Sequence, residues 1–392
     1  MIYSKTINNQ TINGIFHNLP IPIDFFRPLS ECTFQDGDVY YYDRHDLAIR
    51  LLKFKDFIEE QHWSHLKNNP TVKLLLNYSD DYFNAVNIKW ISKGLLERQI
   101  DPKQVYFITM DQNFTNFAIE EFERWNLKGV HVTHYNTLLG KTDASYVSEA
   151  LPTYKFSVLS RNYYSWRLSL FLYLVENNLI DDFVYSFHNY LPYIGGGLNV
   201  PLEEIKQDVL KEGYKLTPKL LNWVEKIPYD LGNRNAKWAN FLSNVISSSD
   251  FHLLIESHFD TFLWDNFRPF TNAYNHKNFA PAFLTEKTWK TVFSKRPFII
   301  AATPYSLEGF RALGFKSFSP FIDETYDTIE DNEARKQALL AEVKRICTLP
   351  TEEYRKVVEG CRSICEYNYS LLKEHHSSIG FNEDFKFFLE IK

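Results

Sequence analysis

The sequence has few cysteines, no long apolar run and no excess of basic charge. Its four cysteines are too few and too unevenly spaced for a disulfide scaffold: Cys32, Cys347, Cys361 and Cys365. No segment approaches the roughly 18 consecutive apolar residues of a membrane-spanning helix. The N-terminal residues MIYSKTINNQ also lack the apolar core of a signal peptide. These absences predict a cytoplasmic protein that has no membrane partner.

The charge balance argues against one broad class of partner. The chain carries 43 Lys and Arg against 49 Asp and Glu, a net charge of −6. General binders of polyanions gain their affinity by neutralising phosphates, which this balance does not favour. A local basic cleft stays compatible with it. With 392 residues, 44% of them hydrophobic and 23% charged, the chain is long enough for two globular domains.

Two glycine-containing segments match phosphate-binding motifs only in part. Gly140-Lys141-Thr142 resembles the end of a P-loop, but that motif needs a glycine where this chain has Tyr135. The run Gly195–Gly197 lacks the third glycine of a dinucleotide fingerprint, because the required position is Val200. Both segments are therefore interpreted as loops, and the missing P-loop argues against a kinase-like phosphotransferase.

The sequence offers no convincing metal site. His62 and His65 are three residues apart, as are His131 and His134. On a predicted strand, the spacing of the second pair directs the two rings to opposite faces. The segment Asp36–Asp38 has the D-x-D form that holds a metal on nucleotide diphosphates, but its place before any Rossmann-like unit favours a turn. We therefore predict no metal ion and no cofactor.

Apolar runs alternate with helical patterns in the first 150 residues. Strands are predicted over 72–78, 105–110 and 130–135, and helices over 47–60, 82–97 and 114–125. This alternation is typical of a doubly wound parallel sheet, an α/β fold. Ligands of such sheets bind beyond the carboxyl ends of the strands, where Asp80, Asp81 and Asp111 fall.

A second α/β series begins near Tyr154. Strands are predicted over 156–160, 183–187, 251–257 and 298–302, and helices over 166–177, from 286, over 307–313 and over 329–346. A polar stretch over 192–230 with one lysine-rich helix interrupts the series. We predict an N-terminal domain over 1–150, a second domain over 151–370, and a C-terminal helix over 371–392 that can pack back on the first domain.

The segment FLTEKTWKTVFSKRPFII, residues 283–300, carries the strongest signal. Thr285 is a good N-cap, and Glu286, Lys287 and Thr288 fill the first helical turn. The start of a helix exposes unpaired N–H groups and the positive end of the dipole, so it favours a phosphate. Lys287 adds a positive charge, and Glu286 supplies two acceptor oxygens suited to a ribose diol. An ordinary capped helix is the alternative interpretation.

Upstream residues support the phosphate interpretation. A predicted strand ends in LLIES with Glu256, and Arg161 and Arg167 flank the turn from another strand to a helix. Guanidinium groups in that turn are placed to reach the same pyrophosphate from the other side. Solvated surface arginines are the alternative.

Three segments, taken in order, resemble the nucleotide-sugar-binding half of GT-B-fold glycosyltransferases. They are the strand followed by arginines, the strand FHLLIES, and the helix–strand TEKTWKTVFSKRPFII. The T-E-K helix start resembles the signature of fucosyltransferases and exostosin-like enzymes. Glycosyltransferase-like proteins of tailed phages show a similar T-E-K-T segment followed by a run like residues 306–327 here. The resemblance covers about half of the chain. Residues 188–240 and 258–282 depart from the fucosyltransferase pattern.

The resemblance implies two Rossmann-like domains facing each other across a cleft, followed by C-terminal helices. It implies a metal-independent transfer of a sugar from a nucleotide diphosphate sugar, such as a UDP-sugar, to an acceptor hydroxyl. Glu286 would hold the ribose and Lys287 the diphosphate. The other predicted residues of this site are Arg161, Arg167, Glu256, Thr285 and Thr288. The candidate bases that deprotonate the acceptor are Asp80, Asp81 and Asp111.

The acceptor has two interpretations. A hydroxymethylated base of phage DNA would fit the phage-like resemblance and would place the protein in the host cytoplasm. A surface glycan or a small molecule is the alternative, since residues 1–150 carry 15 basic and 19 acidic side chains. A non-catalytic nucleotide-binding module of the same fold is a third hypothesis. The residues indicate neither the sugar, nor inversion or retention, nor the oligomeric state.

Overall fold

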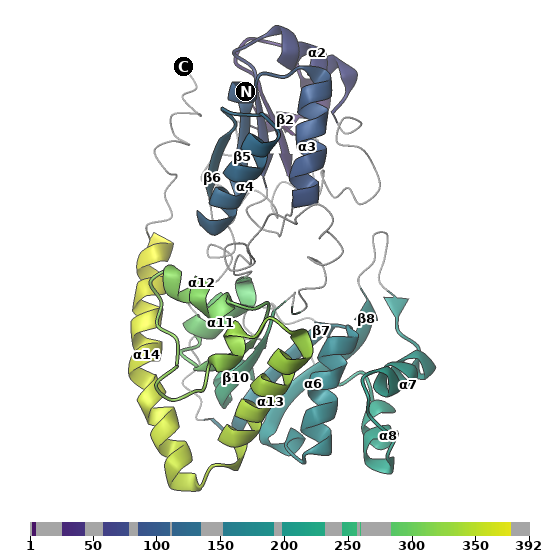
Figure 1. The fold of residues 1–392 in the computed structure, drawn as a ribbon, viewed down its shortest axis with the longest axis vertical. Helices are drawn as coiled ribbons and strands as arrows, with labels where there is room; N and C mark the ends of the chain where they lie inside the picture. The colour runs from purple at the N-terminus through teal and green to yellow at the C-terminus, as the bar shows by residue number, and fades with distance from the viewer. Residues whose placement is uncertain are drawn as a thin grey trace. The chain divides into compact units, whose positions relative to one another are not determined.

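The computed structural model describes residues 2–4, 26–43, 58–77, 85–109, 112–134, 152–191, 198–231, 245–256, 259 and 284–377 (Figure 1). Contacts divide the chain into two compact units, one formed mainly by Met1–Lys141 and the other by Thr142–His376. Each unit is built on its own sheet.

The described part of the first unit contains a six-stranded parallel sheet in the order β2-β1-β3-β4-β5-β6. Its strands are β1 (Ile2–Ser4), β2 (Phe26–Pro28), β3 (Val39–Asp43), β4 (Lys73–Asn77), β5 (Val105–Thr109) and β6 (His131–His134). Its helices are α2 (Glu60–Asn68), α3 (Ala85–Arg98) and α4 (Gln112–Arg124).

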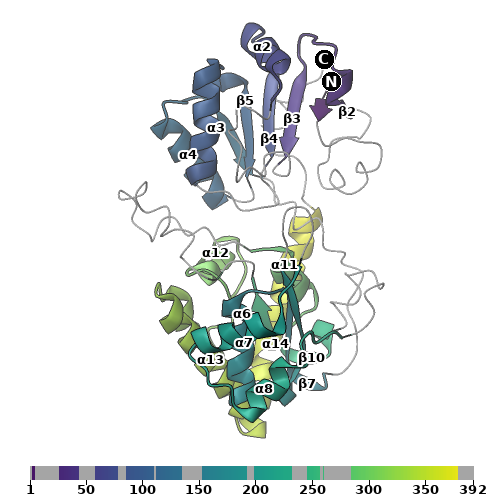
Figure 2. The same ribbon diagram turned by 90° about the vertical axis from the view of Figure 1, so that its right-hand side faces the viewer.

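The central strands of this sheet are buried on both faces. Tyr40–Tyr42 of β3 and Leu74–Leu76 of β4 are fully buried. Successive side chains of a strand point to opposite faces, so three buried residues in a row require cover on both sides. From β3 to β6 each strand lies next to its predecessor, and right-handed crossovers then put α3 and α4 on the same face. The two helices contact each other (Figure 2).

Most elements predicted for the first half are confirmed. The predicted strands correspond to β4, β5 and β6, and the predicted helices over 82–97 and 114–125 correspond to α3 and α4. The predicted helix over 47–60 lies almost entirely outside the described residues. Strands β1, β2 and β3 and helix α2 were not predicted. The first two strands have three residues each, which is too short to leave an alternating pattern.

The described part of the second unit contains a five-stranded sheet in the order β11-β10-β7-β8-β9. All neighbouring strands are parallel except β8 and β9. The strands are β7 (Tyr154–Asn162), β8 (Phe183–Leu191), β9 (Leu198–Asn199), β10 (Ser249–Ile255) and β11 (Phe298–Ala301). The helices are α6 (Ser165–Glu176), α7 (Leu202–Lys211), α8 (Pro218–Val224), α11 (Glu286–Phe293), α12 (Ser306–Ala312), α13 (Asn332–Thr348) and α14 (Thr351–Ser377).

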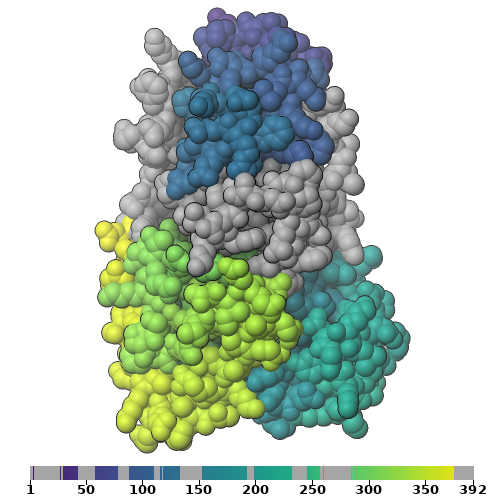
Figure 3. Space-filling model, viewed as in Figure 1, coloured from purple at the N-terminus to yellow at the C-terminus, as the bar shows by residue number. Residues whose placement is uncertain are grey.

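The order of these strands reverses between β7 and β10. From β7 the chain passes through α6 to β8 on one side, and from β10 it passes through α11 to β11 on the other. Right-handed crossovers in opposite directions place α6 and α11 on opposite faces of the sheet. Helix α13 contacts α6, and α13 and α14 form a large part of the visible surface of this unit (Figure 3). Open parallel sheets bind ligands at such a switch point, beyond the carboxyl ends of the strands.

The predicted α/β class with parallel sheets is confirmed. In the second unit the predicted strands correspond to β7, β8, β10 and β11, and the predicted helices to α6, α11, α12 and α13. The polar stretch over 192–230 contains two helices, α7 and α8, where one was predicted. Thr217 caps the second helix by accepting a hydrogen bond from the Leu220 amide, and Pro218 occupies its first position. Residues 378–392 of the predicted C-terminal helix lie outside the described residues.

Within the described ranges, no helix has both the length and the apolar composition needed to cross a membrane. In the same ranges, no three His, Cys, Asp or Glu side chains are placed together to hold a metal ion.

A histidine is buried between the two central strands of the second unit. His252 of β10 lies opposite Ser157 of β7, and its Nδ1 atom is 2.8 Å from the Ser157 hydroxyl. The Ser249 hydroxyl donates to the Ser157 hydroxyl at 2.8 Å. Burial removes water from the imidazole and lowers the pKa of His252 to about 3. The folded protein therefore holds this ring neutral.

This burial predicts a stability that declines in acid. The unfolded chain protonates His252 below its ordinary pKa of about 6.5, whereas the folded chain does not. The unfolded state then binds one more proton at this ring, so the contribution of His252 to the free energy of unfolding falls by about 1.4 kcal/mol per pH unit as the pH drops from 6 towards 4. Urea unfolding at several pH values measures this slope. The variant His252→Asn should show a smaller slope, and equal slopes for the two proteins would contradict the prediction.

Candidate functional site

Helix α11 begins at Glu286, as the sequence predicted, and the structure places its start beside the carboxyl end of β10. Thr285 is its N-cap, and the Thr285 hydroxyl accepts a hydrogen bond from the Lys287 amide at 3.3 Å. The Thr288 amide donates to the Thr285 carbonyl at 3.1 Å. The predicted N-cap is thus confirmed, and two amides of the first turn are satisfied within the helix start.

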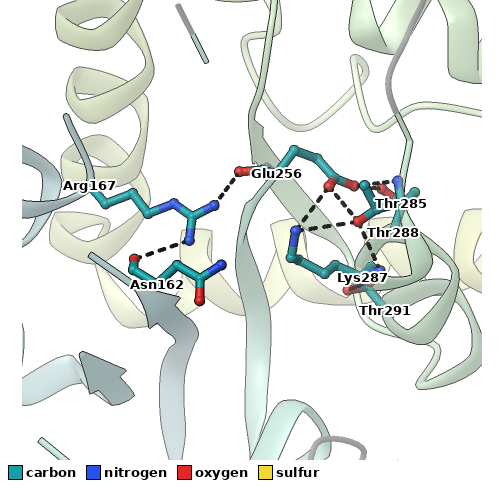
Figure 4. A network of polar contacts seen from close by, with 7 residues as sticks. All are labelled: Asn162, Arg167, Glu256, Thr285, Lys287, Thr288 and Thr291. Atoms are coloured by element: carbon teal, nitrogen blue, oxygen red, sulfur yellow. Dashed lines mark hydrogen bonds and ion pairs between the residues drawn. The ribbon is translucent and has the colours of Figure 1, made fainter. Parts of the chain in front are cut away.

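A buried carboxylate fastens this helix start to β10. Glu256 follows the last residue of β10 and is fully buried. One carboxylate oxygen accepts hydrogen bonds from the Thr285 amide at 2.9 Å and from the Thr288 hydroxyl at 2.6 Å. The other accepts from the Thr285 hydroxyl at 2.6 Å and from the Lys287 ammonium at 3.4 Å (Figure 4). Glu256 thereby joins the switch point of the sheet to the first turn of α11.

Arg167 lies on the other side of the end of β10. It belongs to the first turn of α6, directly after β7, and only 3% of its surface is exposed. Its guanidinium donates to the backbone carbonyl of Glu256 at 2.9 Å and to that of Asn162 at 3.3 Å (Figure 4). Burial lowers the pKa of Arg167 to about 10, so the group stays charged at neutral pH.

Lys287 is an accessible cation at this helix start. Its side chain is 31% exposed, and its ammonium group pairs with the buried Glu256 carboxylate. The charge of Arg167 is not met by a contacting carboxylate among the residues described, because both of its hydrogen bonds go to carbonyls. Among the side chains that the structure describes here, Arg167 and Lys287, together with the positive end of the helix dipole, oppose the charge of Glu256. These described groups therefore carry a positive surplus, which suits a polyanionic ligand.

The remaining predicted residues are Arg161, Glu286 and the three candidate bases. Arg161 is an exposed residue near the end of β7. Glu286 is the first residue of α11, and its side chain is not among those described. The three candidate bases lie outside the described residues. In the sequence, Asp80 and Asp81 follow the end of β4 by three and four residues, and Asp111 follows the end of β5 by two.

The structure uses Glu256 in a way that the sequence did not predict. This acid was predicted among the ligand-binding residues, whereas both of its carboxylate oxygens are engaged at the start of α11. The signal was available: an acid at a strand end and a T-x-x-T pair at a helix start supply a carboxylate and two hydroxyl donors. Thr288 thus serves to hold the helix in the described structure.

Replacing the carboxylate should destabilise the second unit. The variant Glu256→Gln keeps the size of the side chain but replaces one acceptor oxygen by a donor, so the hydroxyls of Thr285 and Thr288 lose charge-assisted bonds. We expect the free energy of unfolding to fall by about 2–3 kcal/mol, and by about 1 kcal/mol in Thr288→Val. Urea unfolding measures both. Losses of equal size would contradict the central role of the carboxylate.

Comparisons with known proteins give only a distant likeness. No known family and no curated protein matches the sequence. The pneumococcal O-GlcNAc transferase GtfA, in complex with UDP and GlcNAc, has a TM-score of 0.45 and 11% identity over 91% of this chain. The E. coli trehalose-6-phosphate protein bound with UDP-2-fluoro glucose has a TM-score of 0.42 and 12% identity over 88%. Trehalose-6-phosphate synthase OtsA has a TM-score of 0.41 and 13% identity over 88%.

This chain spans 58% of the length of the GtfA chain, 73% of the chain bound with UDP-2-fluoro glucose and 72% of the OtsA chain. Likenesses of this size are too loose to carry a function across. The chemistry of this chain therefore has to be judged from its own site.

Proposed function

We propose that this protein is a glycosyltransferase of the GT-B kind, which uses a nucleotide diphosphate sugar as donor. The observation that carries the proposal is the positive surplus of the described side chains at the switch point of the second sheet. There, Arg167 and Lys287 come from two different helices and flank the end of β10. A nucleoside diphosphate brings two or more negative charges, which this surplus can balance.

The proposed reaction breaks the bond between the anomeric carbon and the diphosphate oxygen. The electron pair leaves with the diphosphate, the acceptor oxygen bonds to the anomeric carbon, and the acceptor proton passes to a carboxylate. Negative charge therefore grows on the leaving group, and a fixed cation stabilises it more in the transition state than in the ground state. In this proposal Lys287 contacts the leaving diphosphate.

Arg167 has a different part in the proposal. Its donors are engaged with the carbonyls of Asn162 and Glu256. It therefore holds the ends of β7 and β10 together and adds a buried positive charge beside the end of β10, where the lower dielectric strengthens its effect. Asp80, Asp81 and Asp111 stay the candidate bases, on the ground that each follows the carboxyl end of a parallel strand in the sequence.

The proposed acceptor is a molecule that offers a hydroxyl group. A hydroxymethylated base in DNA and a hydroxyl of a glycan or small molecule are the two candidates. The 15 basic and 19 acidic side chains of residues 1–150 favour the second. Binding of duplex DNA that weakens steeply with salt would favour the first.

The donor half of the proposal is tested with a panel of UDP-, GDP-, ADP- and CMP-linked sugars and their free nucleotides. We expect at least one nucleoside diphosphate to raise the unfolding temperature, and the matching sugar nucleotide to be hydrolysed or consumed in transfer. Stabilisation without turnover would identify a binding module instead of an enzyme. No stabilisation by any nucleoside diphosphate would overturn the proposed function.

A further inference from the structure

Two buried arginines bind the backbone just after β10, at Glu256 and Phe259, two described residues that we call the exit of β10. Arg167 donates to the carbonyl of Glu256, as described above. Arg335 of α13 donates to the carbonyl of Phe259, three residues further on. Only 1% of the surface of Arg335 is exposed. Two cations from helices far apart in the sequence thus fix this exit at two carbonyl groups.

Two aromatic rings lie between these arginines. The guanidinium carbon of Arg335 is 4.5 Å from the centre of the Phe259 ring. The Phe259 ring stacks on Trp166 at 5.1 Å and 17°, and the guanidinium carbon of Arg167 is 5.2 Å from the Trp166 ring. Each cation faces a ring, and the rings face each other. Such contacts are stronger when they are removed from water, as Phe259 and both arginines are here.

Arg335 is itself held in one orientation. Its guanidinium donates to the carbonyls of Ile329 at 2.8 Å and Glu330 at 3.1 Å, and to the side-chain oxygen of Asn332 at 2.8 Å. These acceptors lie just before α13 and at its first residue. A planar fork of donors can serve all of them and the Phe259 carbonyl together, whereas a lysine ammonium has three donors and no fixed plane.

We propose that Arg335 is a positioning residue for the donor site. It holds Phe259 and the Trp166 ring in place, and through them it fixes the position of Glu256 at the end of β10. Since the Glu256 carboxylate holds Thr285 and Lys287, a displaced exit would move the ammonium group that faces the diphosphate. The part of the inference that concerns a diphosphate ligand rests on the proposed function. The part in which Arg335 holds Glu256 and Phe259 in place rests on the contacts alone.

The test compares Arg335→Met and Arg335→Lys with Arg345→Met. Arg345 is a matched control because it lies on the same helix but pairs with Glu342 and donates to the Phe321 carbonyl. Two quantities are measured well below the unfolding temperature. One is the Kd for UDP, GDP, ADP and CMP by calorimetry, and the other is amide hydrogen exchange over residues 251–256 and 284–288.

For Arg335→Met we expect at least tenfold weaker binding of the nucleotide that binds the wild type, together with faster exchange in both segments. Arg335→Lys should recover part of each change, and Arg345→Met should show neither. If Arg335→Met does not fold, Arg335→Lys carries the comparison, because it keeps the charge without the fork.

Three results separate the possible failures. Unchanged amide exchange in the Arg335 variants would overturn the claim that Arg335 holds the end of β10 in place. Faster exchange with an unchanged Kd would overturn the positioning role. If no nucleotide binds the wild type, the proposed function fails, and unaltered or faster exchange in the variants still decides whether Arg335 fixes the end of β10.

Discussion

The variant Lys287→Ala is expected to lose sugar transfer by about 10²–10³-fold while the second unit keeps its fold. The loss follows from removing a fixed positive charge where the leaving diphosphate becomes more negative, an effect worth about 3–4 kcal/mol of barrier in comparable sites. The fold should survive because the Glu256 carboxylate keeps its three hydrogen bonds to Thr285 and Thr288. The buried carboxylate loses its ammonium partner, but these charge-assisted hydrogen bonds and the nearby buried charge of Arg167 continue to stabilise it.

The measurement is the initial rate of transfer or hydrolysis with the sugar nucleotide found in the panel. The matched control is Lys295→Ala, which removes a lysine that follows the other end of α11 and pairs with Glu366. We expect the control to retain its rate and the unfolding temperatures of the two variants to be similar. A rate within a factor of a few of the wild type in Lys287→Ala would remove Lys287 from the mechanism.

The variant Arg167→Met is expected to lose both nucleotide binding and stability. Its methyl thioether fills much of the buried space but donates to neither carbonyl, so the oxygens of Asn162 and Glu256 lose their arginine donor. The Asn162 carbonyl still accepts from the Ser160 hydroxyl, so the main cost, about 1–3 kcal/mol, falls on the buried Glu256 carbonyl. Loss of the buried charge should weaken diphosphate binding on the order of 10²-fold.

Urea unfolding and calorimetric titration separate these two effects. Arg167→Lys keeps the charge without the planar fork, so we expect it to recover more of the binding than of the stability. Arg355→Met is the control, since it removes an exposed arginine of α14 that pairs with Glu352. Tight nucleotide binding by Arg167→Met would contradict the part assigned to the buried charge.

The strands of the second sheet and the helices between them could be predicted because their signals are local. Apolar runs such as FHLLI at β10 and FIIA at β11 are buried on both faces of a parallel sheet, and the helices between them keep a helical spacing. Thr285 was identifiable as an N-cap because capping depends on residues within one turn. The switch point could not be predicted in this way, because it depends on the strand order, which local sequence patterns do not report.

The contacts around Arg335 could not be predicted in the same way. They join residues of α6, α13 and position 259, and no local pattern reports on contacts over such distances. One signal was present: Arg335 lies four residues before Leu339 and eight before Val343, on the buried stripe of α13. A charged residue in an apolar register indicates a buried partner, although not which one.

A crystal structure with the stabilising nucleoside diphosphate bound tests the central claim most directly. The account predicts the diphosphate at the carboxyl end of β10, with an oxygen about 3 Å from the Lys287 ammonium. A diphosphate bound away from Lys287 and from the end of β10, or a crystal in which this position stays empty at saturating nucleotide, would contradict it.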